Sequence, residues 1–137
     1  MRIEGGCLCG KVRYSGEAEP IFVGVCHCET CQKGSGTAFN TVVAVPKAAV
    51  NTTGTVRTYQ GRGDSGKATY KRFCPECASP IAIEAEVMAD VVMIPAGTLD
   101  DKSQIKPAMQ IYCDSAQSWA VLAGDIQRFP KMPMPGG

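Results

Sequence analysis

Hydrophobic and polar positions along the chain follow the short, alternating pattern that is typical of β-strands. Charged and apolar residues alternate over Lys11 to Tyr14, and a similar alternation returns over Ile81 to Glu86. Val91 to Ile94 is a short run of apolar residues only. We expect further strands, most of them bounded by turn residues, at Ile21 to Val25, Phe39 to Val45, Val56 to Tyr59, Ala68 to Phe73, Ala108 to Tyr112 and Trp119 to Leu122.

Helical signals are weak and local. Only Pro46 to Val50 and the residues that follow Cys28 suit a helical turn, and no segment sustains a period of 3.6 residues. The chain contains no internal repeat, linker or low-complexity tract. We therefore expect a mainly β fold in a single domain over residues 1–137, with a core at about residues 5–130. The tail from Pro130 to Gly137 is expected to be irregular.

The composition fits an ordered globular domain with a hydrophobic core. Hydrophobic residues make up 45% of the chain and the net charge is +1, a balance that argues against a nucleic-acid or membrane partner. No apolar run is long enough to cross a bilayer, and Met1 to Gly6 leads into neither the apolar region nor the cleavage site of a secretion signal. We therefore expect a cytoplasmic protein, whose thiols stay reduced.

Eight cysteines stand out in this composition, and seven of them form three tight groups. The groups are Cys7 and Cys9, then Cys26, Cys28 and Cys31, then Cys74 and Cys77. A disulfide within a Cys-x-Cys segment would close a small, strained ring, and a reducing compartment disfavours disulfides in general. The spacing instead predicts that these seven thiols bind metal.

The spacing also divides the seven cysteines into a set of four and a set of three. In an extended segment Cys7 and Cys9 would point to the same side and grip one ion. Cys74 and Cys77 form a C-x-x-C turn, so the two pairs together supply the four thiolates of a closed tetrahedral zinc site. The central group supplies three thiols and leaves the fourth position of a second zinc open to water, substrate or a thiol. We therefore expect two zinc ions per chain.

Three alternatives to this division follow from the same residues. His27, the only histidine, could close the second site, although in an extended Cys-His-Cys segment its ring points away from both sulfurs. The isolated Cys113 could also be a ligand, but its strand-like surroundings favour a small buried hydrophobic residue. The three central cysteines could instead act without metal, as redox thiols of lowered pKa.

The loop between residues 61 and 68 contains the glycine spacing of two phosphate-binding motifs. The dinucleotide fingerprint needs a helix after it, whereas Ala68 to Phe73 is expected to be a strand. A P-loop needs a hydroxyl side chain where this chain has Ala68. We therefore interpret this stretch as the loop of a long hairpin.

The cysteine groups and their flanking residues together resemble the glutathione-dependent formaldehyde-activating (GFA) enzyme family. The segments that carry the resemblance occur in the family's order from about Gly5 to Pro130, and they are Gly5 to Tyr14, Cys26 to Cys31, Phe73 to Cys77, Ala96 to Asp100 and Ser115 to Trp119. The resemblance implies a zinc-binding β fold of the Mss4-like type, built of short antiparallel strands. It also implies a structural zinc on the first and last cysteine pairs and a second zinc on the central group.

The family is named for joining formaldehyde to glutathione as S-(hydroxymethyl)glutathione, or for the reverse cleavage of the carbon–sulfur bond. The resemblance therefore implies a zinc-dependent carbon–sulfur lyase or adduct-forming enzyme that acts on a small thiol such as glutathione. Cys26, Cys28 and Cys31 would hold the catalytic zinc, and His27 or Glu29 would move the proton. The alternative is a non-enzymatic, zinc-stabilised β module that binds a protein or a thiol. The sequence carries no signal for an oligomeric state.

Two positions depart from the family pattern. Ala78 follows Cys77 where most members have glycine, so we expect a slightly altered turn there. Gln110 stands where many members have histidine, a change that would remove a polar group near the reactive site.

Overall fold

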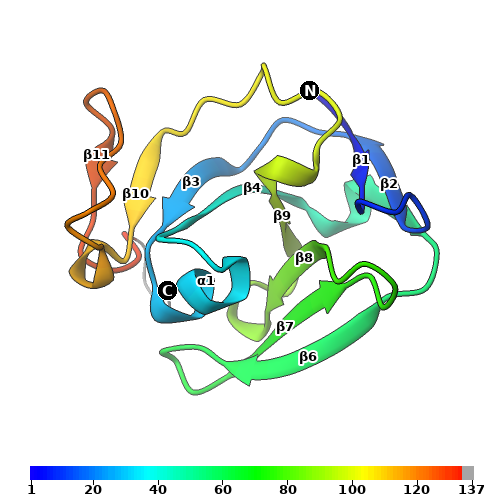
Figure 1. Cartoon of the computed structure of the whole chain (residues 1–137), viewed down its shortest axis with the longest axis horizontal. Helices are drawn as coiled ribbons and strands as arrows, with labels where there is room; N and C mark the ends of the chain where they lie inside the picture. Colours follow the sequence, from blue (N-terminus) through cyan, green and yellow to red (C-terminus); the bar gives the residue numbers. More distant parts are fainter. Residues whose placement is uncertain (134–137) are drawn as a thin grey trace.

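The computed structural model describes residues 1–133 and contains two β-sheets that pack against each other (Figure 1). The smaller sheet has three antiparallel strands in the order β1-β2-β5. These strands are β1 (Arg2–Gly6), β2 (Arg13–Glu17) and β5 (Val50–Thr53). β1 and β2 form a hairpin, and the first cysteine pair lies in its turn.

The larger sheet has eight strands in the order β11-β10-β3-β4-β9-β8-β7-β6. In chain order these strands are β3 (Phe22–Cys26), β4 (Asn40–Pro46), β6 (Arg57–Arg62), β7 (Ala68–Phe73), β8 (Pro80–Ala85), β9 (Val91–Pro95), β10 (Met109–Ile111) and β11 (Gln127–Arg128). Most neighbours are antiparallel, and the expected long hairpin is present as β6 and β7. The expected fold of short, mostly antiparallel strands is confirmed, and β10 is the exception, since it runs parallel to both β3 and β11.

Within residues 1–133 the helical structure consists of one short α-helix and four 3₁₀ turns. The helix α1 (Glu29–Ser35) follows Cys28 and η1 (Lys47–Ala49) follows Pro46, so both expected helical turns are confirmed. The remaining 3₁₀ turns are η2 (Glu86–Met88), η3 (Ala96–Thr98) and η4 (Cys113–Ser115). No helix in the described part of the chain has the length and apolar character needed to cross a membrane.

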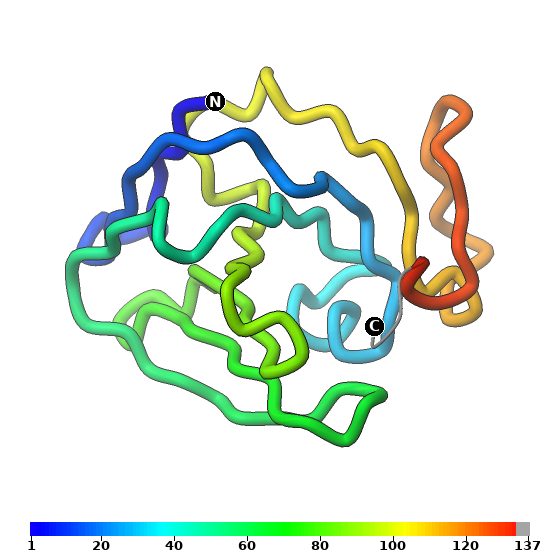
Figure 2. Tube along the Cα trace, turned by 180° about the vertical axis from the view of Figure 1, so that it is seen from behind, coloured from blue at the N-terminus to red at the C-terminus, as the bar shows by residue number. Residues whose placement is uncertain are grey.

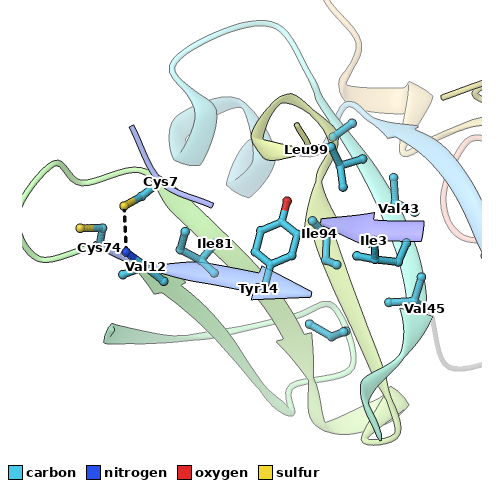
Figure 3. Close-up of a cluster of buried hydrophobic side chains, with 12 residues drawn as sticks. Ile3, Cys7, Val12, Tyr14, Val43, Val45, Cys74, Ile81, Ile94 and Leu99 are labelled. Atoms are coloured by element: carbon cyan, nitrogen blue, oxygen red, sulfur yellow. Dashed lines mark hydrogen bonds between the residues drawn. The ribbon is translucent and has the colours of Figure 1, made fainter. Parts of the chain in front are cut away.

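The main hydrophobic core lies between the two sheets (Figure 3). Ile3 on β1 and Tyr14 on β2 enter it from the smaller sheet, and they meet Val43, Val45 and Ile94 of the larger sheet. The first strand buries alternate residues, as a half-buried strand does. Full burial of one such aliphatic side chain contributes roughly 1.5–3 kcal/mol. The core therefore holds the β1–β2 hairpin in a defined position on the larger sheet.

The strand expected at Trp119 to Leu122 is wrong. This segment is a turn followed by irregular chain, and the side chains of Trp119 and Val121 are 72% and 89% exposed. A short apolar run forms a stable strand only where it pairs with a neighbour, and within residues 1–133 this segment pairs with no strand of either sheet. The expected irregular tail contains no strand over residues 130–133, and its last part, residues 134–137, lies outside the described residues.

Three segments meet at one end of the larger sheet. The end of β3, the start of α1 and the chain that follows β10 lie side by side there in both views (Figures 1 and 2). The pairing of β10 with β3 places Ile111 opposite Cys26. This end of the sheet therefore carries the central cysteine group.

Candidate metal centres

Four cysteines come together where two hairpin turns meet. Cys7 and Cys9 lie in the β1–β2 turn, and Cys74 and Cys77 lie in the turn between β7 and β8. The four sulfurs lie within 4.8 Å of one another. Cys9 and Cys74, which are 65 residues apart in the sequence, have sulfurs only 3.7 Å apart. The structure thus joins the first and last groups of the sequence into one group of four.

The first pair converges for a reason other than the predicted one. Cys7 and Cys9 do not lie in an extended segment, because the chain turns between them and the amide of Gly10 donates to the carbonyl of Cys7 at 3.1 Å. Gly10 has a φ of 80°, a left-handed value that glycine adopts without strain. A tight turn, and not strand alternation, therefore brings these two sulfurs to 3.5 Å.

The spacing of these sulfurs fits a tetrahedral zinc ion. A Zn–S bond of about 2.3 Å implies neighbouring sulfurs about 3.8 Å apart, and the distances are 3.5 Å for Cys7 with Cys9 and 3.7 Å for Cys9 with Cys74. Backbone amides point at two of the sulfurs: Val12 donates to Cys7 at 3.2 Å (Figure 3), and Glu76 donates to Cys74 at 3.4 Å. Four sulfurs with amide donors around them are the donor set of a closed site.

Hydrogen bonds also favour the ionised form of two of these thiols. The hydroxyl of Ser79 lies 3.3 Å from the sulfur of Cys77, and Ser79 lowers the pKa of Cys77 to about 5. Burial alone would raise the pKa of Cys7, but the amide of Val12 and the thiols of Cys9 and Cys74 outweigh burial and lower it. The thiolate is the form that binds zinc, so the lowered pKa values of Cys7 and Cys77 favour metal binding by both residues.

Ala78, directly after Cys77, has a positive φ of 63°. Its amide donates to the carbonyl of Cys74 at 2.8 Å, while the amide of Cys74 donates to the carbonyl of Ser79 at 3.0 Å. These two hydrogen bonds close the turn and require the left-handed backbone that favours glycine. The turn therefore keeps the conformation suited to glycine although the residue is alanine.

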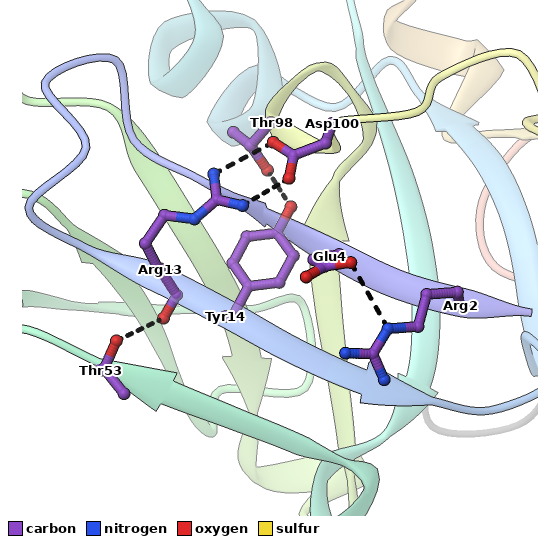
Figure 4. Close-up of polar contacts among 7 residues, drawn as sticks. All are labelled: Arg2, Glu4, Arg13, Tyr14, Thr53, Thr98 and Asp100. Carbon is purple, nitrogen blue, oxygen red and sulfur yellow. Dashed lines mark hydrogen bonds and ion pairs between the residues drawn. The ribbon is translucent and has the colours of Figure 1, made fainter.

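The β1–β2 hairpin is tied to the segment around η3 beside this group (Figure 4). Arg13 donates two hydrogen bonds to the carboxylate of Asp100, one of them at 3.0 Å. The hydroxyls of Tyr14 and Thr98 lie 2.6 Å apart. A Cβ atom on Gly5 would lie 2.2 Å from the carbonyl oxygen of Thr98, so the two backbones approach as closely as glycine permits. These contacts hold the first cysteine pair in place.

Cys26, Cys28 and Cys31 form the second group, with all three sulfurs within 4.8 Å of one another. Cys26 ends β3, Cys28 is the N-cap residue of α1, and Cys31 lies in the first turn of that helix. In the described part of the chain no other cysteine, histidine or carboxylate completes this group. The group therefore offers three ligand atoms and leaves one tetrahedral position for another molecule.

The three thiols of this group differ in acidity. The thiols of Cys26 and Cys31, followed by the amides of Cys31 and Thr30, outweigh burial and lower the pKa of Cys28 to about 3. Cys28 in turn raises the pKa of Cys26 to about 12. The two neighbouring thiols raise the pKa of Cys31. Cys28 is therefore the first residue of the group to present a thiolate to a metal ion.

His27 belongs to neither group, and its side chain is buried. Its Nε2 lies 2.9 Å from Oε1 of Gln110, an oxygen that also accepts a hydrogen bond from Arg128 at 3.2 Å. Because this oxygen can only accept, Nε2 of neutral His27 carries the proton. Nδ1 has no hydrogen-bond partner among the described residues. The expected loss of a polar group at Gln110 is wrong, because the glutamine amide contacts His27 directly.

The structure also places the other residues considered from the sequence. Cys113 begins η4 and is half-buried, so the strand-like context expected for it is wrong. It joins neither cysteine group of the described chain. Glu29 is exposed, and its carboxylate lies 3.9 Å from the ammonium group of Lys33. Of the two residues considered for proton transfer, His27 is buried and Glu29 faces solvent.

Two residues near the second group could not be recognised from the sequence. Tyr112 follows β10, and Asp64 lies in the loop between β6 and β7. Burial and the nearby groups of Asp64, Cys26 and Cys28 raise the pKa of Tyr112 to about 12. No local pattern marks Tyr112, because its position depends on the parallel pairing of β10 with β3.

The fold and the two cysteine groups define a mainly β protein with two sets of thiols that could each hold a metal ion. A family model described as glutathione-dependent formaldehyde-activating enzyme matches residues 2–115. The chain belongs to this GFA family, as its motifs indicated.

A crystal structure of a Rhodobacter sphaeroides protein is similar in fold. Its TM-score is 0.59 at 16% sequence identity, and the match covers 72% of this chain and 88% of that chain. At this identity the likeness shows a shared fold alone. No curated protein matches the sequence.

Proposed function

We propose that the protein is a zinc-dependent carbon–sulfur lyase, which forms or cleaves the adduct of a small thiol such as glutathione with an aldehyde such as formaldehyde. The observation that carries this proposal is the central group of three converging sulfurs, to which the described chain adds no fourth ligand. Membership of the GFA family supports the choice of thiol and aldehyde.

Two zinc ions per chain are part of the proposal. The closed structural site would be formed by Cys7, Cys9, Cys74 and Cys77, and the open catalytic site by Cys26, Cys28 and Cys31. The chemistry supplied by zinc at an open position is that of a Lewis acid, which lowers the pKa of a bound thiol or polarises a carbonyl. The sulfur distances of 3.5 and 3.7 Å support the assignment of the closed site.

The proposed reaction conserves its atoms and protons without an oxidant. The thiol sulfur attacks the aldehyde carbon, one C–S bond forms, and the C=O π bond becomes a C–O single bond. The proton of the thiol ends on this oxygen. His27 is the candidate for this transfer, because its buried Nδ1 has no hydrogen-bond partner among the described residues. The contact of its Nε2 with Gln110 holds the ring in this tautomer.

The test is turnover of glutathione and formaldehyde by the zinc-loaded protein, measured as the rate of adduct formation above the uncatalysed rate. We expect two zinc ions per chain by metal analysis and a rate that saturates with thiol. Cys28→Ser should abolish catalysis, whereas the matched variant Cys113→Ser should keep it. A wild-type protein that holds both ions but shows no rate enhancement would contradict the proposal and favour a zinc-stabilised binding module.

A further inference from the structure

The chain leaves β10 directly beside the three-cysteine group. Ile111, the last residue of β10, is the register partner of Cys26, and the amide of His27 donates to the carbonyl of Ile111 at 3.0 Å. Tyr112 is the next residue, so its backbone lies alongside the segment from Cys26 to Cys28. Figure 2 shows the same meeting of β3, α1 and the chain that follows β10.

Tyr112 is held in a conformation that large side chains rarely adopt. Its φ of 55° and ψ of 41° are left-handed values, which are uncommon for a bulky residue. The chain beyond it is anchored, because the amide of Cys113 donates to the carbonyl of Phe129 at 3.0 Å and the amide of Ser115 donates to the carbonyl of Tyr112 at 3.1 Å. Strained residues that their surroundings hold in place gather at functional sites.

The Tyr112 side chain is half-buried, and its pKa is raised by burial and by groups from three other segments. Asp64 comes from the β6–β7 loop, Cys26 from the end of β3, and Cys28 from the start of α1. All three groups raise the pKa of Tyr112, as does burial. A tyrosine phenol has an ordinary pKa of about 10, so it is a hydrogen-bond donor at neutral pH without any shift.

We propose that Tyr112 is a catalytic residue of the three-cysteine site, whose phenol O–H donates a hydrogen bond to the aldehyde-derived oxygen of the substrate. This inference rests on the proposed carbon–sulfur lyase function. As the C–S bond forms, the electron pair of the C=O π bond moves onto the oxygen, where the Tyr112 hydroxyl stabilises the developing charge. The proton that finally reaches this oxygen comes from the thiol, so Tyr112 is neutral before and after the reaction.

Tyr112→Phe removes only the hydroxyl and keeps the ring, so it tests this role directly. We expect the zinc content, the melting temperature and the affinity for glutathione to match those of the wild type, while kcat falls by about 100-fold. Tyr59→Phe is the matched control, because Tyr59 is 66% exposed on β6, and it should keep the wild-type kcat. A purely structural role would instead change zinc content or melting temperature together with kcat.

The outcomes separate this inference from the function on which it rests. A Tyr112→Phe protein that keeps its kcat within about two-fold overturns the role of Tyr112 and leaves the lyase function standing. A wild-type protein without catalysis overturns the lyase function and this role with it. If Tyr112→Phe does not fold, Tyr112→Gly provides the same measurement, because glycine suits the left-handed backbone. Retained kcat in that variant overturns the role as well.

Discussion

At the scale of single residues, Ala78 and Tyr112 are the two positions of the described chain that have a positive φ without being glycine. The conformation of Ala78 is imposed by the turn that holds Cys74 and Cys77. That of Tyr112 arises where the chain leaves β10. A left-handed backbone costs an ordinary L-residue roughly 1–2 kcal/mol. The surrounding structure therefore holds both residues in a conformation that they would not adopt by themselves.

Ala78→Gly should stabilise the zinc-loaded protein by about 1 kcal/mol, because glycine adopts the left-handed backbone without steric cost. We expect the melting temperature, followed by circular dichroism, to rise by roughly 3–6 °C. Ala89→Gly is the matched control and should lower the melting temperature, since Ala89 has an ordinary φ of −60°. An unchanged or lower value for Ala78→Gly would mean that the turn carries no strain.

Glu84 on β8 is a buried carboxylate that lies between two cations, Lys47 and Arg72. Burial alone would raise the pKa of Glu84, but the hydrogen bonds from Lys47, at 2.6 Å, and from Arg72 outweigh burial and hold the pKa below its ordinary value. Its pKa in the folded protein is therefore lower than in the unfolded chain. The carboxylate contributes stability above about pH 4.3, the unfolded value, and this contribution is lost as the pH falls through the lowered pKa.

Glu84→Gln should reduce the free energy of unfolding at neutral pH by about 1–3 kcal/mol, because it removes the ionised acceptor of hydrogen bonds from two cations. The difference from the wild type should shrink as the pH falls below about 4. Urea unfolding of both proteins from neutral pH to below about pH 4 measures this difference in the free energy of unfolding. Because acid removes zinc from both proteins alike, that effect does not contribute to the difference. Glu17→Gln, at an exposed position on β2, should change little. A difference that is constant with pH would rule out the charge of Glu84 as its cause.

At the scale of elements, α1 depends on contacts outside itself. It has seven residues and buries none of them, and isolated helices shorter than about 12 residues are marginal in water. Gln32 donates to the carbonyl of His27 at 2.7 Å and to that of Ser115 at 2.9 Å. Lys71 on β7 donates to the carbonyl of Gly34 at 2.7 Å. These polar contacts, together with the cysteines, position the helix.

Gln32→Ala should loosen α1 and η4 together, because it removes the side-chain donor to the His27 carbonyl and one of the two donors to the Ser115 carbonyl. We expect a loss of about 1–3 kcal/mol in the free energy of unfolding and faster amide hydrogen exchange in residues 28–36 and 113–117. Amides of the two sheets should keep their protection. Gln60→Ala, at an exposed position on β6, is the control. Faster exchange throughout the chain would indicate a global effect and contradict this local role.

At the scale of the whole molecule, the four-cysteine group links the two sheets. Cys7 and Cys9 belong to the hairpin of the smaller sheet, and Cys74 and Cys77 belong to a turn of the larger sheet. The three-cysteine group instead connects the end of β3 to the adjacent helix α1. Loss of the first link would weaken the packing of one sheet on the other, whereas loss of the second would loosen only a short helix.

Cys7→Ser should therefore destabilise the protein by several kcal/mol or unfold it, because metal binding at such a link contributes directly to folding. Cys28→Ser should keep the β-sheet spectrum and cooperative unfolding of the wild type. Circular dichroism, thermal unfolding and zinc content per chain measure the contrast. Equal destabilisation by the two substitutions would mean that both groups are structural, and it would weaken the lyase proposal.

Most of the strands and both helical turns could be predicted, because alternation and turn residues are properties of neighbouring positions. The segment from Trp119 to Leu122 shows the limit of that reasoning, since a local apolar run does not report whether another strand lies beside it to pair with. The grouping of the cysteines could also be predicted, because chelating pairs are close in sequence. Their binding of zinc and their roles remain predictions.

The sequence by itself determined the strand pattern, the three cysteine groups and their division into four and three, because each depends on spacing within a few residues or on the number of ligands that zinc takes. Only the tertiary structure decided that a turn brings Cys7 and Cys9 together and that Gln110 contacts the ring of His27. It also decided that the strained Tyr112 directly follows the register partner of Cys26. The last two features arise from the parallel register of β10 on β3, which joins residues more than 80 positions apart. No local pattern in the sequence encodes that register.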